Sequence, residues 1–309
     1  MICENQQELE SYVAHARHWT QKGKVADYIP ALAKANQAAL AVSIYEPGKH
    51  CFSAGEVEHK FTLQSISKVL ALAVALEDIG EEAVFEHIGM EPTGDPFNSI
   101  IKLETYKPSK PLNPMINAGA LAVTSLIRGS NNHERLERLL HFIQDITNNS
   151  NVKVCEEVAQ SEFDTSFLNR SMCYYMKQHN VISGDVEEIL ELYTKQCAVE
   201  VSCRDLARIG AVFAFDGKDP DTDRRIFPTN VARICKTFMV TCGMYNASGE
   251  FAIKVGIPAK SGVSGGIMCA VPGRIGIGIF SPALDEKGNS LAGMRLLEKM
   301  AKAYDLSMF

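Results

Sequence analysis

A serine and a lysine three residues apart, Ser65 and Lys68, have the types and the spacing needed for nucleophilic catalysis. They precede a run of apolar helix formers, residues 69–76, so we expect both side chains on one face near the first turn of a helix. A serine hydroxyl is a weak nucleophile until a base removes its proton. A lysine can be that base, and we therefore predict that burial and any nearby cation depress the pKa of Lys68.

A second short motif lies far along the chain, where Lys260 is followed by Ser261 and Gly262. This order, serine-x-x-lysine and then lysine-hydroxyl-glycine, is the skeleton of serine β-lactamases and penicillin-binding proteins. Each motif is weak by itself, because the first also fits a helix start with an exposed lysine and the second fits a turn followed by a strand. Their order and their surroundings together favour the catalytic interpretation.

Further polar residues lie between or beside these motifs, each with an ordinary structural alternative. Asn117 has small neighbours that permit close approach of a ligand, but it also precedes an apolar helical run that it could cap. Glu162 taken by itself is typical of a surface acid, and Tyr193 in an amphipathic helix is typical of a packing residue. Tyr245 follows a helix end at Gly243, which would present its ring from a loop.

Hydrophobic patterning indicates the elements that must position these residues. Residues 38–45 are typical of a strand, and a turn signal separates them from a return strand at 50–53. The chain from 80 to 240 is mainly helical in pattern, most clearly at 136–146 and 186–198. We also expect helices at 6–21, after Pro30 and at 291–304, and short strands at 251–256, 265–271 and 274–280.

Strands at both chain ends with helices between them predict an α+β fold, in which one antiparallel sheet is assembled from the two ends. We expect a β-lactamase- or penicillin-binding-protein-like arrangement, with flanking helices and an inserted helical subdomain. The chain of residues 1–309 would form a single catalytic domain. Its sheet lobe would comprise about 25–80 and 241–309, and its helical lobe about 81–240.

The composition is that of an ordinary globular protein, with 46% hydrophobic and 22% charged residues and a net charge of −6, which lacks the basic footprint of nucleic-acid binding. No apolar run is long enough to cross a membrane. The nine cysteines are scattered without metal-site spacing, and the N-terminus lacks a secretory pattern, so we expect reduced thiols in the cytoplasm. Aspartates at 216–223 lack EF-hand spacing and favour a solvated loop over a calcium site.

Several longer segments together resemble one known family, the serine-dependent glutaminases of β-lactamase fold. The resemblance covers about residues 20–305, as in a bare bacterial-type catalytic unit. Asn246 stands where the family usually has aspartate, and Ser264 stands where glycine is common. The segments that carry the resemblance are 26–30 (ADYIP), 64–68 (QSISK), 113–120 (NPMINAGA), 242–250 (CGMYNASGE) and 256–263 (GIPAKSGV).

The resemblance implies hydrolysis of L-glutamine to L-glutamate and ammonia through an acyl-enzyme, with no cofactor and no metal. Ser65 would attack the carboxamide and Lys68 would take its proton, in part by relay with Tyr245. Lys260 would support the site electrostatically. Backbone N–H groups of Ser65 and Val263 would form the oxyanion hole.

For the substrate's other end, the resemblance implies that Glu162 holds the α-ammonium group. It also implies a homotetramer or homodimer. Other enzymes on the same fold (a cytoplasmic esterase or β-lactamase), a non-catalytic glutamine sensor and an asparaginase side activity stay open as alternatives. The remaining substrate-binding residues would be Tyr28, Gln64, Asn117, Asn169 and Tyr193.

Overall fold

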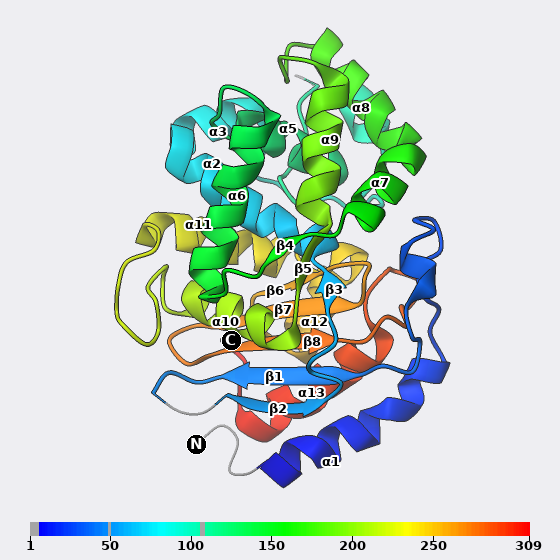
Figure 1. Ribbon diagram of the computed structural model, residues 1–309, viewed down its shortest axis with the longest axis vertical. Helices are drawn as coiled ribbons and strands as arrows, with labels where there is room; N and C mark the ends of the chain where they lie inside the picture. Colours follow the sequence, from blue (N-terminus) through cyan, green and yellow to red (C-terminus); the bar gives the residue numbers. More distant parts are fainter. Residues whose placement is uncertain (1–5, 49–50, 106–108) are drawn as a thin grey trace.

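The computed structural model describes residues 6–48, 51–105 and 109–309, and its larger sheet contains strands from both ends of the chain (Figure 1). Within these ranges the strand order is β2-β1-β8-β7-β6, with every neighbouring pair antiparallel. Val42 lies opposite Ile279, so the chain ends meet as the sequence predicts. The strands are β1 (Ala41–Tyr45), β2 (Phe52–Gly55), β6 (Ala259–Ser261), β7 (Gly266–Val271) and β8 (Ile275–Phe280).

Helices cover both faces of this sheet. α10 (Cys203–Ala214) packs on one face, and α1 (Gln6–Ala16) and α13 (Leu291–Tyr304) pack on the other, at the bottom of Figure 1. Most of the remaining helices gather in the upper half of the figure. The remaining helices are α2 (Ser67–Ile79), α3 (Glu81–His87), α4 (Ile101–Thr105), α5 (Asn117–Leu126), α6 (Asn132–Thr147), α7 (Glu156–Thr165), α8 (Phe167–Gln178), α9 (Val186–Cys197), α11 (Thr229–Cys242) and α12 (Ser248–Lys254), of which α12 lies in the lower half beside the sheet.

The alternating sequence of β8, IGIGIF, explains how α10 approaches the sheet so closely. The isoleucines belong to the hydrophobic cluster formed with α1 and α13. The glycines face α10, where a Cβ at Gly276 would lie 1.9 Å from the carbonyl oxygen of Ala207 and one at Gly278 would lie 2.3 Å from that of Cys203. Only glycine allows this contact between a helix backbone and a strand.

Helix α2 runs through the larger hydrophobic core, and all of its residues from Ser67 to Leu76 are buried. α5, α6, α9 and α11 pack around it, which suits a helix that is apolar on every side. The 3₁₀ helix η3 (Gln64–Ile66) leads directly into α2. The expected helix at the serine–lysine pair is confirmed, and the alternative of an exposed Lys68 is wrong.

The predicted strand at 251–256 is wrong, because most of this segment belongs to helix α12. Phe251 is buried while Ile253 is 88% exposed. Packing of Phe251 in the core therefore outweighed the local β-propensity of the segment. The first helix ends at Ala16 and continues as 3₁₀ helix η1 (Arg17–Gln21), and the segment after Pro30 forms only η2 (Leu32–Lys34).

A second, small sheet was not predicted from the sequence. Its order is β3-β5-β4, with β3 (Phe61–Thr62), β4 (Lys153–Val154) and β5 (Val199–Val201). Strands of two or three residues are too short to show a period. The return strand expected at 50–53 is β2, although His50 lies outside the described residues, as do the N-terminal segment 1–5 and its Cys3.

The acidic segment 216–223 is a loop tied to the sheet-covering helix α10 by buried Arg208. The Arg208 guanidinium lies 2.5 Å from the Asp219 carboxylate and 2.7 Å from that of Asp221.

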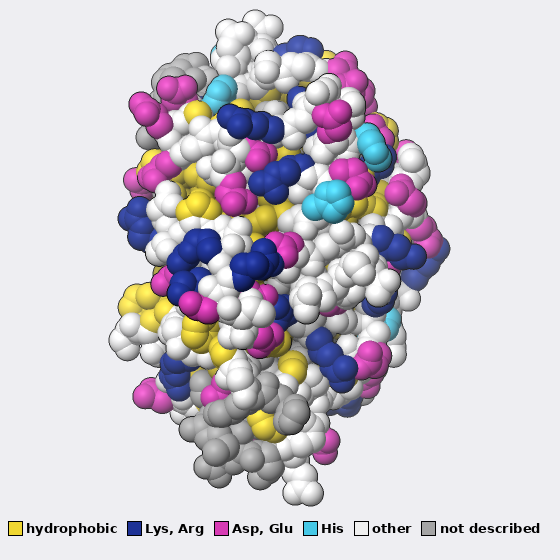
Figure 2. Space-filling model, turned by 60° about the vertical axis from the view of Figure 1, so that its left-hand side comes forward, with side chains coloured by type: hydrophobic (Ala, Val, Ile, Leu, Met, Phe, Trp, Pro, Cys, Tyr) yellow, Lys and Arg dark blue, Asp and Glu magenta, His cyan; other side chains and the backbone are white. Residues whose placement is uncertain are grey.

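Over the described ranges, no group of acidic, histidine and cysteine side chains could hold a metal ion, and no disulfide is present. Acidic and basic side chains are interspersed on the face in Figure 2. None of the described helices is long and apolar enough to span a bilayer.

Candidate active site

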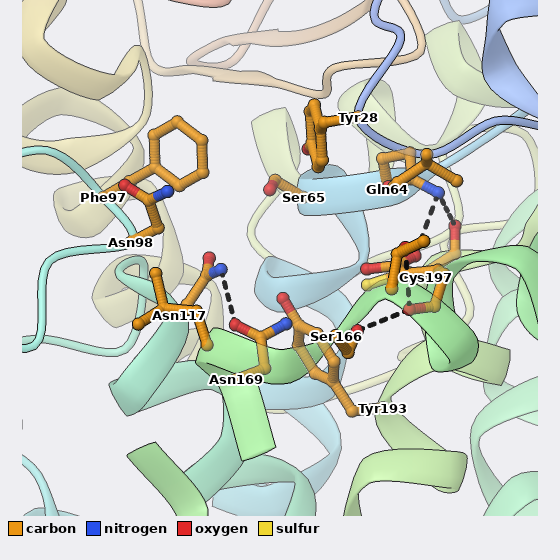
Figure 3. Close-up of a pocket in the computed structure, with 14 residues that line it drawn as sticks. Tyr28, Gln64, Ser65, Phe97, Asn98, Asn117, Ser166, Asn169, Tyr193 and Cys197 are labelled. Carbon is orange, nitrogen blue, oxygen red and sulfur yellow. Dashed lines mark hydrogen bonds between the residues drawn. The ribbon is translucent and has the colours of Figure 1, made fainter. Parts of the chain in front are cut away.

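A cavity of about 410 Å³ opens where η3 meets α5, α7, α8 and α9. Figure 3 shows Ser65 at the end of the pale blue helix, with Tyr28 above it and Asn117 and Asn169 below. Lys68, Tyr245, Lys260 and Val263 are outside the lining of this cavity. The predicted residues that do line it are Tyr28, Gln64, Ser65, Asn117, Glu162, Asn169 and Tyr193.

Ser65 lies in the 3₁₀ turn η3, which leads into α2, and not in α2 itself. The preceding Gln64 has a φ of +48°, a left-handed conformation that is unusual for any residue except glycine. This conformation brings Ser65 to the N-terminal end of the helix, where N–H groups lack intrahelical acceptors and the dipole is positive. Its side chain borders the cavity.

Lys68 is 1% exposed and lies behind the cavity wall. Its Nζ donates hydrogen bonds to the Met115 carbonyl oxygen at 3.2 Å and to Asn117 Oδ1 at 2.7 Å, and not to Ser65. Burial lowers the pKa of Lys68 to about 8, while the carboxylate of Glu162 opposes the decrease. The predicted depression is therefore present, with burial as its cause.

Lys260 and Tyr245 pack together near Lys68 and Ser65. Lys260 Nζ lies 4.6 Å from the centroid of the Tyr245 ring and donates to the Ser261 carbonyl oxygen at 2.8 Å. Burial, and after it the charge of Lys68, lower the pKa of Lys260 well below its ordinary value. The lowered pKa of Lys68, in turn, has burial as its cause.

The Tyr245 hydroxyl is buried and lies beside the Ser65 hydroxyl. Burial raises the pKa of the Tyr245 phenol, and the adjacent Ser65 hydroxyl opposes that rise. Tyr245 also has a left-handed backbone, with a φ of +50°. Gly243 before it is not a left-handed helix cap; a Cβ there would lie 1.8 Å from the Ala259 carbonyl oxygen.

Glu162 is buried in the wall of the cavity, so the surface alternative is wrong. Gln64 Nε2 donates to Glu162 Oε2 at 3.3 Å. Burial raises the pKa of Glu162 to about 7, against the opposing effects of this hydrogen bond and of the Lys68 charge. Asn117 does not cap its helix: it accepts from Lys68 and donates to Asn169 Oδ1 at 3.0 Å.

Sequence reasoning missed several lining residues, among them Phe97, Asn98, Ser166 and Cys197, which Figure 3 labels. The Phe97 ring lies 4.6 Å from the Tyr245 ring. Cys197 accepts a hydrogen bond from Gln64 Nε2 on its carbonyl oxygen at 3.5 Å. No local signal marked either residue, because a lone phenylalanine in a loop and a cysteine in an amphipathic helix are typical of packing.

Ser264 and Asn246, the two departures from the family pattern, each donate a side-chain hydrogen bond to a backbone carbonyl oxygen. Ser264 Oγ donates to the Thr62 carbonyl oxygen at 2.6 Å, which ties the turn after β6 to β3. Asn246 Nδ2 donates to the Gly94 carbonyl oxygen at 3.2 Å. Neither side chain lines the cavity at Ser65.

The glutaminase family model matches residues 23–309. The chain belongs to the glutaminase family. Curated glutaminases from Geobacillus thermodenitrificans and Bacillus subtilis (its glutaminase 2) are 65% identical over 305 residues and 63% identical over 309 residues. The alignments cover 99% of both chains in the first case and 100% of both in the second. Glutaminases hydrolyse L-glutamine to L-glutamate, and this chain is an enzyme with that activity.

A solved structure with a similar fold is the covalent complex of a Bacillus subtilis glutaminase with 5-oxo-L-norleucine, formed by its reaction with 6-diazo-5-oxo-L-norleucine. It is 40% identical to this chain, with a TM-score of 0.89, and the match covers 98% of this chain and 99% of that one. The glutaminase fold therefore extends over the whole length described here.

Proposed function

We propose that this glutaminase works through a serine acyl-enzyme, with Ser65 as nucleophile and Lys68 as general base. The observation that carries the proposal is a cavity-lining serine followed, one helical turn later, by a buried amine whose pKa is about 8. A base with a pKa near the working pH combines a useful neutral fraction with enough basicity to take a proton.

In the proposed reaction, Ser65 Oγ attacks the side-chain carbonyl carbon of glutamine while its proton passes to Lys68, directly or through Tyr245. Lys68 would exchange one of its two present acceptors for Ser65. The C–N bond then breaks, and the departing nitrogen takes up that proton and leaves as ammonia. Water hydrolyses the resulting ester to release glutamate. The buried Tyr245 hydroxyl beside Ser65 supports this proton route, and the packing of Lys260 on the Tyr245 ring supports an electrostatic role for Lys260.

The oxyanion of the tetrahedral intermediate would accept from the backbone N–H groups of Ser65 and Val263. This proposal is supported by the backbone hydrogen bonds of turns and loops. Among the described residues, neither the Ser65 N–H nor the Val263 N–H is a donor in such a bond. Ser65 also lies in a first helical turn, where no intrahelical acceptor exists. One such donor contributes about 3 kcal/mol to transition-state stabilisation.

The α-ammonium group of glutamine would pair with Glu162. A carboxylate with a pKa of about 7 is partly protonated in the free enzyme, and the bound cation would favour its charged form. The covalent complex of the Bacillus subtilis relative supports a nucleophile that meets a glutamine-like molecule, because 6-diazo-5-oxo-L-norleucine has the glutamine skeleton with a diazomethyl ketone in place of the carboxamide. The remaining proposed contacts to substrate come from Tyr28, Gln64, Asn117, Asn169 and Tyr193.

The proposed architecture is β-lactamase-like, with a single catalytic domain over 1–309. Its sheet lobe comprises about 25–80 and 241–309, and its helical lobe about 81–240, from which α10 packs on the sheet. The antiparallel sheet built from both chain ends supports this proposal. The homotetramer or homodimer and the cytoplasmic location stay predictions.

The mechanism is tested with purified wild type and Ser65→Ala, measuring ammonia and glutamate release from glutamine, with asparagine and nitrocefin in parallel. We expect glutamine turnover in the wild type and none in Ser65→Ala. Ser171→Ala, an exposed serine of α8 outside the cavity, serves as the matched control and should retain full activity. Glutamine turnover that survives in Ser65→Ala would refute the serine mechanism, and nitrocefin turnover with glutamine inert would favour a β-lactamase.

A further inference from the structure

The strained backbone of Tyr245 is held by two residues that the mechanism above does not use, Ser248 and Asn289. Ser248 Oγ donates to the Tyr245 carbonyl oxygen at 2.9 Å and accepts from the Met244 N–H at 3.1 Å. Asn289 Nδ2 donates to the Met244 carbonyl oxygen at 3.3 Å. A left-handed residue other than glycine persists only where its surroundings enforce that conformation. These three hydrogen bonds fix the peptide groups on both sides of Tyr245.

Asn289 is fully buried and closes a tight loop that starts at Asp285. The Asp285 N–H donates to the Asn289 carbonyl oxygen at 2.8 Å, and the Asn289 N–H donates to Asp285 Oδ1 at 2.9 Å. Within the same loop, Gly288 approaches both the Tyr245 ring and Val263, since a Cβ there would lie 3.6 Å and 3.8 Å from their carbon atoms. One loop therefore touches both the phenol ring of Tyr245 and Val263, which lies in the turn after β6.

We propose that Asn289 is a positioning residue of the glutaminase reaction, because it anchors the Met244 carbonyl and thereby directs the Tyr245 hydroxyl toward Ser65. This inference rests on the proposed proton-transfer role of Tyr245. Without the Asn289 amide, the Met244 carbonyl oxygen loses this side-chain donor and still accepts from the Ala247 N–H at 3.0 Å. Asn289 does not line the substrate cavity, so its loss should change kcat and leave KM unaltered.

A double-mutant cycle between Asn289→Ala and Tyr245→Phe tests this role. In the wild-type background, we expect Asn289→Ala to lower kcat about tenfold with KM unchanged, the equivalent of one lost buried hydrogen bond. In the Tyr245→Phe background, Asn289→Ala should cause no further loss, because the hydroxyl that it positions is already absent. Equal fold-losses in both backgrounds would show a merely structural role and overturn the inference.

The cycle also separates this inference from the proposed mechanism. If Tyr245→Phe by itself keeps wild-type kcat, the proton-transfer role of Tyr245 fails, and the inference fails with it. If Tyr245→Phe loses activity while Asn289→Ala keeps it, only the inference fails. Should Asn289→Ala not fold, Ser248→Ala removes the other side-chain anchor of the same turn and is expected to show the same dependence on Tyr245.

Ser290→Ala is the matched control for general loosening of this region. Ser290 is equally buried and adjacent in sequence, but its hydroxyl caps α13 by accepting from the Gly293 N–H at 3.2 Å. Losing this cap should lower the melting temperature by about 2–3 °C and leave kcat unchanged. A fall in kcat matching that of Asn289→Ala would assign both effects to loosening and refute a specific role for Asn289.

Discussion

Replacing Lys68 by methionine should abolish glutamine turnover and, at neutral pH, stabilise the protein. Methionine keeps an unbranched side chain of similar length without the amine. Lys68 is 1% exposed, and burial lowers the pKa of its amine to about 8 from 10.5. The native state therefore carries a desolvation penalty whenever this amine is protonated, and the variant lacks that penalty.

The size of the effect follows from the two pKa values. At about 1.4 kcal/mol per pH unit, the separation of about 8 from 10.5 corresponds to about 3 kcal/mol of unfolding free energy. Below pH 8 the amine is charged in both states and the penalty is complete. Between pH 8 and 10.5 the unfolded chain binds more protons, so this contribution to wild-type stability rises with pH.

Lys68→Met also loses the hydrogen bonds from the amine to Met115 and Asn117. This loss destabilises the variant by about 1–2 kcal/mol at every pH and offsets part of the gain. Lys68→Met should then be more stable than wild type by about 1–2 kcal/mol at pH 7 and less stable by a similar amount near pH 10.5. Urea unfolding of both proteins at pH 7, 8.5 and 10 measures this difference.

Lys302→Met, at an exposed position of α13, is the control because it removes the same charge without the burial. The decisive quantity is the pH dependence of the difference between Lys68→Met and wild type. A difference that stays constant from pH 7 to 10 would mean that the native protein does not depress the pKa of Lys68. The argument that burial makes Lys68 a base near neutral pH would then be wrong.

Three further predictions concern Glu162, Arg208 and Gly276. Because the pKa of Glu162 is about 7, KM for glutamine should fall as pH rises from 6 to 8, and Glu162→Gln should raise KM about 10–100-fold and remove this dependence in initial-rate assays. Arg208→Met leaves Asp219 buried and unpaired, so urea unfolding should show a loss of about 3 kcal/mol with KM unchanged; a loss below about 0.5 kcal/mol would contradict this account. Gly276→Ala places a Cβ 1.9 Å from a backbone oxygen of α10 and should lower stability by about 2 kcal/mol or more, whereas Gly94→Ala meets no atom within 4 Å and should not.

Much of the fold could be predicted where an element buries one side along its whole length. The helices at 186–197 and 291–304 and the strands at 266–271 and 275–280 follow their sequence patterns closely. The segment at 251–256 misled because its β-propensity is a local preference, and helix α12 forms where Phe251 can reach the core. The small β3-β5-β4 sheet joins residues more than a hundred positions apart, and no local pattern encodes that pairing.

For the active site, the sequence by itself determined the chemistry: a serine and a lysine one turn apart, a second lysine in a lysine-hydroxyl-glycine motif, and family segments around them. Only the tertiary structure decided which groups meet. It pairs Lys68 with Asn117 and Gln64 with Glu162, and it packs Lys260 on the Tyr245 ring. It also sets the pKa of Lys68 near 8 and that of Glu162 near 7. The physical reason is that desolvation depends on every atom that surrounds a side chain in space, and most of those atoms come from distant parts of the chain.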